Sequence, residues 1–446
     1  MSIDAVALAE ELNRSCHCIS VDPLALRRCL ESGPLTAGVY ESIQQNQPNL
    51  FSASSVFLAR AHLEHMQAVI SAIETVLRSD GFRAWAFELA PAIARHDHGP
   101  RGVFLGYDFH LGQDGPQLIE INTNAGGGLL NAALARAQQA CCAEVEAAVR
   151  GAHDAGGLEA GFVAMFRDEW RLQRGGAPLR RVAIVDEEPS AQYLYPEFLL
   201  FQQLFGHAGL AALIVDPRGL VYERGAVWAD GARVDLVYNR LTDFWLAGAA
   251  CTALRAAYAA GDVVVTPNPH VYARYADKRH LAVLSDPDRL RTWGIDADVI
   301  ALLAASVPHT RVVDAADREL LWRERKQYFF KPVEGYGGKA AYRGDKLTRA
   351  TWEQILARPY VAQHLVPPSQ RTIAIDGRAV PLKLDLRNYV YAGQVQLVAA
   401  RLYQGQTTNM RTAGGGFAPV LTTPSADADR EPPRAPRSQQ ETPVAA

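Results

Sequence analysis

The stretch QLIEINTNAGGG, residues 117–128, places a short apolar run, a carboxylate, an amide and three glycines close together. Side chains alternate between the two faces of a strand, so Glu120 and Asn122 share one face. A strand that only stabilises a sheet has no need for both groups on one face. A glycine run that opens a helix indicates a sharp bend or a close approach of the backbone. The stretch therefore predicts a functional strand followed by a tight turn.

Residues 102–122 are typical of a hairpin: GVFLGYDFHL, the turn GQDGP, then QLIEIN. If the turn is centred on Asp114, Asp108 lies directly across from Glu120, and opposed Cβ atoms are about 5 Å apart. With Asn122, two carboxylates and an amide oxygen then converge. Such hard oxygen donors suit a magnesium ion that carries phosphates. A sheet with solvated acids on its outer face is the alternative.

Composition indicates an ordinary soluble protein of two or three domains. The chain has 446 residues, of which 48% are hydrophobic and 21% charged. Its net charge of −3 lacks the excess of basic residues that is typical of nucleic-acid-binding proteins. No apolar run approaches the roughly 20 residues that span a membrane. The start lacks the basic segment of a signal peptide, so we expect a cytoplasmic protein. Six cysteines follow no disulfide framework.

The chain divides into segments of different pattern. Residues 1–101 read as helical, and 102–150 hold the hairpin and a following helix. Residues 179–269 alternate strands and helices, which predicts a small open α/β domain. Residues 270–420 are mixed, with several strands. The tail 424–446 is rich in proline and polar residues and is expected to be disordered.

Lysine is confined to one quarter of the chain. All six lysines fall between residues 278 and 383, and lysine suits contacts with phosphate oxygens. Lys331 ends an apolar strand in FFKPVEGYGGKAAYRGD, residues 329–345, where a glycine-rich turn joins two strands. The GxxxxGK[ST] spacing is absent. We interpret the turn as a flap that covers a triphosphate with backbone N–H groups; an ordinary glycine hairpin is the alternative.

Three arginines gather around residues 382–420. Asp385 and Arg387 share a face of one predicted strand, Arg401 ends the next, and Arg411 lies in a glycine-rich loop. Like charges in one place repel one another unless an anion is present. Pairing with surface acids is the alternative.

Residues 270–420 resemble an ATP-grasp ligase, close in pattern to bacterial glutathione synthetase and the ribosomal-protein glutamate ligases. ADKRHLAVLSD is similar to the family's first lysine segment, FFKPVEGYGG to its second lysine and glycine flap, and YVAQHLVPP to the hinge whose backbone contacts adenine. The hinge reads AQHL where many relatives place a carboxylate. The resemblance implies these nucleotide-contacting residues: Lys278, Lys331, Glu334, Gly335, Gly337, Gly338, Gln363, His364, Leu365 and Val366.

The order of the segments resembles a circular permutation. In the ordinary family order, the metal strand follows the triple glycine at 414–416, whereas here GYDFHLGQDGPQLIEINTNAGG stands at 106–127. The eukaryotic-type glutathione synthetases have this arrangement. The resemblance implies an α/β (α+β) protein with a permuted ATP-grasp fold, an inserted α/β substrate domain and a helical N-terminal region. It also implies a metal site of Glu120 and Asn122, with Asp108 and Glu334 as alternatives for the third ligand.

The implied activity is that of an ATP-dependent carboxylate–amine ligase, with ATP and Mg²⁺, that forms an acyl phosphate on a small amino-acid or peptide-like acid. DLRNYVYAGQ and ARLYQGQTTNMRTAGGG match the family's arginine strands and substrate loop. The implied catalytic and substrate-binding residues are Arg387, Arg401 and Arg411, and Arg240, Asn409, Gly414 and Gly415. Expected partners are a small acid and an amine, with neither nucleic acid nor membrane. The alternatives are a phosphotransferase with a hydroxyl acceptor and a non-catalytic ATP-binding protein.

Overall fold

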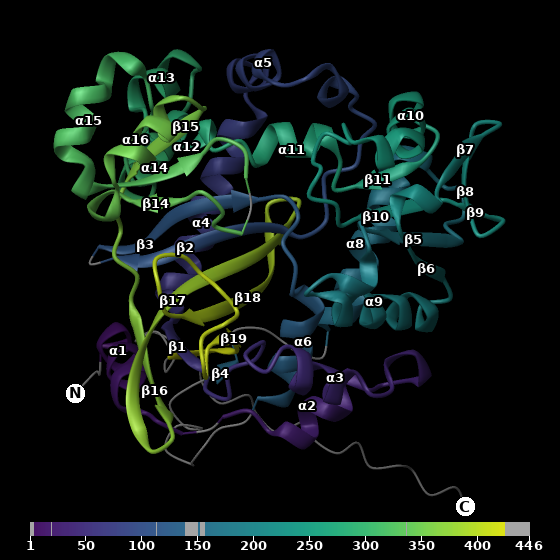
Figure 1. Ribbon diagram of the computed structural model, residues 1–446, viewed down its shortest axis with the longest axis horizontal. Helices are drawn as coiled ribbons and strands as arrows, with labels where there is room; N and C mark the ends of the chain where they lie inside the picture. The colour runs from purple at the N-terminus through teal and green to yellow at the C-terminus, as the bar shows by residue number, and fades with distance from the viewer. Residues whose placement is uncertain are drawn as a thin grey trace, which may run out of the picture.

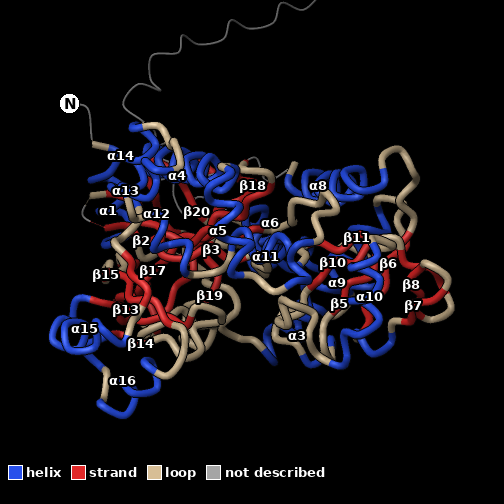
Figure 2. The backbone as a smooth tube through the Cα atoms, turned by 90° about the horizontal axis from the view of Figure 1, so that it is seen from above, coloured by secondary structure: helices blue, strands red, loops and turns tan. Residues whose placement is uncertain are grey.

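The computed structural model describes residues 4–18, 20–112, 114–138, 150–151, 157–335 and 337–423. A larger part is built around a central antiparallel sheet, and a smaller α/β part lies beside it (Figures 1 and 2). The tail predicted over 424–446, and much of the helix predicted before residue 150, lie outside these ranges. None of the helices in these ranges combines the length and the hydropathy that a membrane span requires.

Helices dominate the described part of residues 1–101, as their periodicity predicts. They are α1 (Ala5–Ser15), α2 (Pro23–Leu30), α3 (Val39–Asn46), α4 (Arg60–Arg78) and α5 (Asp80–Leu89), with the strand β1 (Val56–Ala59) between α3 and α4. Helix α4 buries Met66, Ile70 and Ile73 in the cluster that covers one face of the central sheet. These buried residues are three or four positions apart, so they form one apolar stripe along the helix.

The central sheet joins the hairpin near residue 110 to strands from the last quarter of the chain. It contains β2 (Leu105–Gly112), β3 (Gly115–Asn122), β16 (Gln370–Ile375), β17 (Arg378–Tyr391), β18 (Gln394–Tyr403) and β19 (Gly416–Ala418). The order is β19-β18-β17-β2-β3, with β16 also pairing β17. The strand pairing that a permuted fold requires is therefore present, while the permutation itself stays a prediction.

The β2–β3 hairpin contains a β-bulge. From the Gly112–Gly115 pair that ends the ladder, regular pairing would put Asp108 opposite Ile119. The register instead shifts by one residue, so that Asp108 pairs with Glu120 and Ile119 is the extra residue. The predicted opposition of the two carboxylates is confirmed, but a bulge produces it, rather than the symmetric turn that we expected.

A second sheet and a group of helices form the adjoining lobe. The strand order is β12 (Thr310–Val312), β15 (Tyr360–His364), β13 (Tyr328–Pro332) and β14 (Tyr342–Arg343). The helices are α11 (Pro269–Tyr275), α12 (Arg279–Leu284), α13 (Pro287–Thr292), α14 (Ala297–Ser306), α15 (Arg318–Glu324) and α16 (Arg349–Leu356). Phe330 of β13 and Trp352 of α16 lie in one buried cluster, which fixes the strand that carries Lys331.

The smaller part has the open α/β architecture predicted for 179–269. Its parallel sheet has the order β11 (Val264–Thr266), β10 (Leu236–Asn239), β5 (Arg181–Val185) and β6 (Ala211–Val215). An antiparallel meander is formed by β7 (Val221–Glu223), β8 (Ala226–Ala229) and β9 (Ala232–Val234). The helices are α8 (Leu158–Arg174), α9 (Tyr195–His207) and α10 (Thr252–Ala260).

One helix and two strands remain. Helix α6 (Gly128–Ala137) begins at the glycine turn after β3, and β20 (Val420–Thr423) pairs with β1 and with β4 (Arg150–Gly151). The glycine turn is constrained, because a Cβ on Gly127 would lie 2.3 Å from the ring of Phe417 and the residue has φ +95°. Glycine is therefore required where β3 leads into α6.

Candidate active site

One face of the central sheet is apolar, and the other carries charged groups beside a second apolar cluster. Tyr107 and Leu386 belong to the cluster that includes α4. Because successive strand residues point to opposite faces, Asp108 and Arg387 point the other way, as does Arg401 on β18. All three line a cavity on that face. Strand alternation and the pairing of β2 with β17 thus bring together charged groups from two distant segments of the chain.

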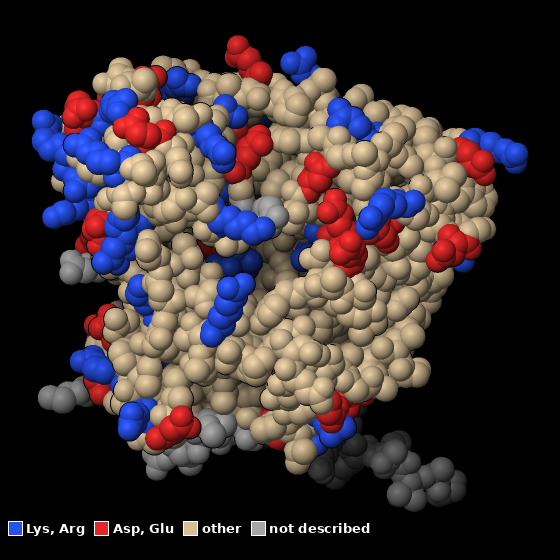
Figure 3. All heavy atoms as spheres, viewed as in Figure 1, with Lys and Arg blue, Asp and Glu red and all other residues tan. Residues whose placement is uncertain are grey.

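The cavity has a volume of about 520 Å³. Figure 3 shows Lys and Arg side chains around the hollow of this face. Its charged lining consists of Arg240, Lys278, Lys331, Lys339, Arg387 and Arg401, with Asp108, Glu120, Asp186 and Asp385 as the carboxylates. Since cations outnumber carboxylates, the cavity favours an anionic ligand.

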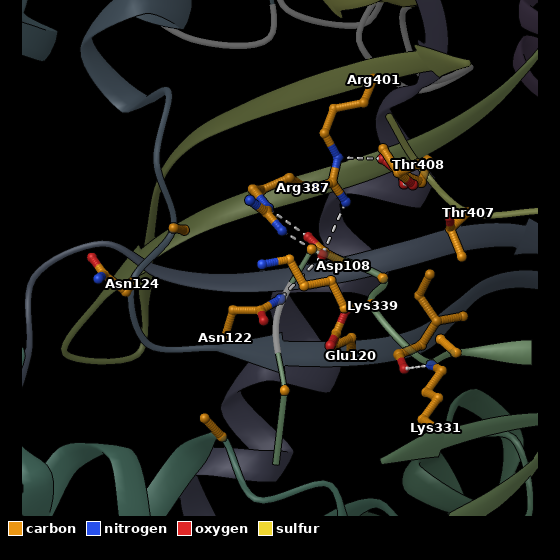
Figure 4. Close-up of a pocket in the computed structure, with 18 of the residues that line it drawn as sticks. Asp108, Glu120, Asn122, Asn124, Lys331, Lys339, Arg387, Arg401, Thr407 and Thr408 are labelled. Carbon is orange, nitrogen blue, oxygen red and sulfur yellow. Dashed lines mark hydrogen bonds and ion pairs between the residues drawn. The ribbon is translucent and has the colours of Figure 1, made fainter. Parts of the chain in front are cut away.

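Asp108 lies between two arginines (Figure 4). Arg387 donates to both carboxylate oxygens, at 2.7 and 2.6 Å, and Arg401 lies 2.9 Å from the second. Arg401 also donates to Asp385 at 2.7 Å. Burial alone would raise the pKa of Asp108, but the two guanidinium groups hold it far below its ordinary value. The carboxylate therefore stays ionised and orients both arginines.

Glu120 and Asn122 lie next to this cluster. Asn122 donates to Asp108 at 3.2 Å, and Glu120 lies 3.2 Å from the ammonium of Lys278. Burial would raise the pKa of Glu120, but Lys278 and Lys331 outweigh that effect and hold it below its ordinary value. The carboxylate and amide that the sequence placed on one face thus both line the cavity.

Lys331 is held by the bulge. Its ammonium donates to the carbonyl of Ile119 at 2.6 Å and to the side-chain oxygen of Gln363 at 2.8 Å. Burial lowers the pKa of Lys331 to about 8. Lys278 donates to the carbonyl of Gly335 at 3.0 Å. Both lysines therefore rest on protein oxygens that an incoming anion can replace.

The predicted hinge follows one wall of the cavity. Gln363, His364, Leu365 and Val366 all line it. The side-chain nitrogen of Gln363 is buried and has no hydrogen-bond partner among the described residues. His110 shares a hydrogen bond of 2.9 Å with the Val366 carbonyl, and burial lowers the pKa of its imidazole.

The glycine flap lies over the cavity, but Glu334 points elsewhere. Gly335, Gly337 and Gly338 line the cavity, and Gly338 lies so close to Thr407 that a Cβ would come within 2.9 Å of its side chain. Glu334 is exposed and outside the lining, and it accepts a hydrogen bond of 3.3 Å from Trp245. The flap thus touches both the 404–410 loop and the α/β part.

Arg240 lies on the α/β wall of the cavity. It donates to Asn124 at 2.6 Å, and its Nε is buried without a partner among the residues that the structure describes. Glu197 accepts hydrogen bonds from the backbone of Gly127 and Leu129, which ties the glycine turn to α9. Arg240 therefore reaches the cavity with donor capacity to spare.

The third arginine is placed differently from the other two. Arg411 is exposed and lies outside the cavity lining. Gly414 and Gly415 also lie outside it, but Gly414 is half-buried and Gly415 is buried. Asn409 lines the cavity and donates to the carbonyl of Gln404 at 2.7 Å. Roles for Arg411 and the two glycines stay predictions.

Sequence reasoning missed several residues of the lining. Asp186 directly follows the parallel strand β5, where open α/β sheets bind ligands, and burial raises its pKa to about 6. His110 follows Asp108 by two positions on the same face. Both signals were available in the sequence. Gln192 and Tyr193 lie on a loop before α9, and no pattern marks them.

The sequence matches no model of a protein family and no curated protein. Among solved structures, the chain is similar to a glutathione synthetase-like effector from Globodera pallida in its apo form, at 12% identity over 90% of this chain and 98% of that chain, with a TM-score of 0.52. It also matches a putative gamma-glutamylcysteine synthetase from Methylobacillus flagellatus KT, at 10% identity over 81% and 88% of the two chains, with a TM-score of 0.44. A third match is the ATP-grasp ligase PsnB, at 17% identity over 55% and 89%, with a TM-score of 0.28. The chain therefore has a fold similar to that of the glutathione synthetase-like effector.

Proposed function

We propose that this protein is an ATP-dependent carboxylate–amine ligase that activates a small amino-acid or peptide-like acid as an acyl phosphate. The observation that carries the proposal is that one cavity brings together a carboxylate–amide pair, two lysines and two paired arginines. These are the groups needed for phosphate binding and for stabilising an oxyanion.

The lysines and the hinge would hold the nucleotide. Lys278 and Lys331 exchange their present oxygen partners for phosphate oxygens, while the backbone at 363–366 contacts adenine. The flap then covers the phosphates with its N–H groups. Its contacts with the 404–410 loop and with Trp245 support this assignment.

The donor set fits magnesium. Glu120 and Asn122 offer hard oxygens at the cavity surface, and Mg²⁺ is usually held by one or two protein groups with phosphates and water as the other ligands. When bound, Mg²⁺ would neutralise phosphate charge. Of the alternatives for a third ligand, Asp108 would have to release two arginines and Glu334 would have to leave Trp245.

The remaining residues serve the acid and amine. Arg240 binds a carboxylate of the acid away from the reacting one. An oxygen of the reacting carboxylate attacks the γ-phosphorus of ATP, and ADP leaves. The amine nitrogen then attacks the acyl carbon, and inorganic phosphate leaves. Arg387 and Arg401 stabilise the oxyanion formed in that attack, and Asp108 holds them in place.

The test is ADP release across a panel of amino acids, short peptides and amines, with Mg²⁺ present. An acid that stimulates ADP release without amine should give a hydroxamate when hydroxylamine is added. Glu120→Gln should abolish turnover with the fold intact, whereas Asp114→Asn, in the exposed turn, should not. A stable phosphoester without hydroxamate would indicate a hydroxyl kinase instead, and nucleotide binding without turnover would indicate a non-catalytic protein.

A further inference from the structure

His110 projects from β2 into the cavity beside the hinge, and the mechanism above gives it no role. Its Nδ1 lies 2.9 Å from the carbonyl oxygen of Val366. A carbonyl can only accept, so Nδ1 must carry the hydrogen. At pH 8 an imidazole with an ordinary pKa of about 6.5 is neutral. Nε2 is then a bare lone pair that can only accept a hydrogen bond.

The position of this acceptor connects it with a nucleotide. His110 lines the cavity together with hinge residues 363–366. The described residues provide no hydrogen-bond partner for its Nε2. Two other side-chain acceptors of the lining are already occupied: the oxygen of Gln363 binds Lys331, and Asp385 binds Arg401.

We propose that Nε2 of His110 accepts a hydrogen bond from the nucleoside part of the nucleotide, either from a ribose hydroxyl or from the exocyclic amino group of the base. The hydrogen bond from Nδ1 to Val366 fixes the tautomer and the ring orientation. His110 is thus a specificity-determining residue. The proposal rests on the proposed function only in that a nucleotide occupies the hinge.

Two substitutions separate the roles of the two ring nitrogens. In His110→Asn the amide nitrogen replaces Nδ1 and keeps the hydrogen bond to Val366, but no acceptor reaches the cavity. In His110→Gln the amide oxygen reaches the position of Nε2, while the hydrogen bond to Val366 is lost. His207→Asn is the matched control, because this exposed histidine at the end of α9 lies outside the cavity lining.

The experiment is calorimetric titration at pH 8 with ADP, 2′-deoxy-ADP, 3′-deoxy-ADP and purine riboside diphosphate, which lacks the amino group. The wild-type protein should bind one analogue about three- to tenfold more weakly than ADP, as expected for one hydrogen bond, and that analogue identifies the donor. His110→Asn should bind ADP and that analogue equally. His110→Gln should show part of the difference that the wild-type protein shows, and His207→Asn should show all of it.

Two results would overturn the proposal while leaving the ligase intact: a wild-type protein that discriminates against none of the analogues, or a His110→Asn variant that still discriminates. If the wild-type protein binds none of the four nucleotides, the ligase proposal is overturned as well. Because each variant is judged by the ratio of two affinities, a uniform loss of binding does not imitate the expected result.

Discussion

Replacing Asp108 by Asn tests whether one buried carboxylate organises the arginine pair. Asp108 is 1% exposed, and the side chain of Arg387 is 12% exposed. The substitution removes the charge that Arg387 contacts through its Nε and Nη2 atoms, and leaves that arginine as a buried cation. Removing one partner of a buried ion pair costs about 3–5 kcal/mol. We expect a loss near 3 kcal/mol, because Asn still accepts one hydrogen bond and Arg401 keeps Asp385.

The assay is urea unfolding at pH 7.5, with Asp114→Asn as the matched control. Asp114 is exposed in the hairpin turn, so its replacement should change the free energy of unfolding by less than about 0.5 kcal/mol. The pKa of Asp108 lies below that of an unfolded Asp, so its stabilisation is present above pH 4 and is lost as the pH falls further. The difference between the two variants should therefore shrink toward pH 3. A loss below 1 kcal/mol at pH 7.5, or a difference independent of pH, would refute this reasoning.

Three further predictions concern other residues. ADP affinity should fall as the pH rises through 8, because Lys331 loses its charge there. In Lys331→Arg the affinity should not change over this pH range; the same pH dependence in both proteins would count against this prediction. Gly127→Ala should destabilise the fold by about 2 kcal/mol or more, since its Cβ meets Phe417; an unchanged melting temperature would contradict the tight turn. Arg401→Ala should raise the activation free energy of amide formation by about 3 kcal/mol, measured from the rates with hydroxylamine and with amine. The variant for comparison is Arg411→Ala, at an exposed site outside the cavity lining.

Much of the site could be predicted because strand alternation is a local property. Glu120 and Asn122 share a face whatever the sheet contains, and Asp385 and Arg387 follow the same rule on β17. The bulge at Ile119 could not be predicted, since it depends on how β2 and β3 pair. It decides that Asp108 opposes Glu120 and that a free carbonyl meets Lys331.

The sequence also could not predict which distant charged residues pair with one another. Three arginines in one region indicated an anion site, yet two of them share Asp108 and the third is exposed. Arginine near a glycine-rich loop looks the same in sequence whether or not its side chain enters the cavity. Likewise, Glu334 stands in the predicted flap, and only the tertiary fold directs it to Trp245.

The order of the strands along the chain has a consequence for biosynthesis. Asp108 and Arg387 are 279 residues apart, so a ribosome that adds about 5–20 residues per second needs roughly 15–60 s to make the second after the first. During that time the nascent β2–β3 hairpin lacks its neighbour β17. Helix α4, made earlier, is available to cover its apolar face. Fragments released before β17 should therefore bind no nucleotide, and the hairpin edge is where a chaperone would be needed most.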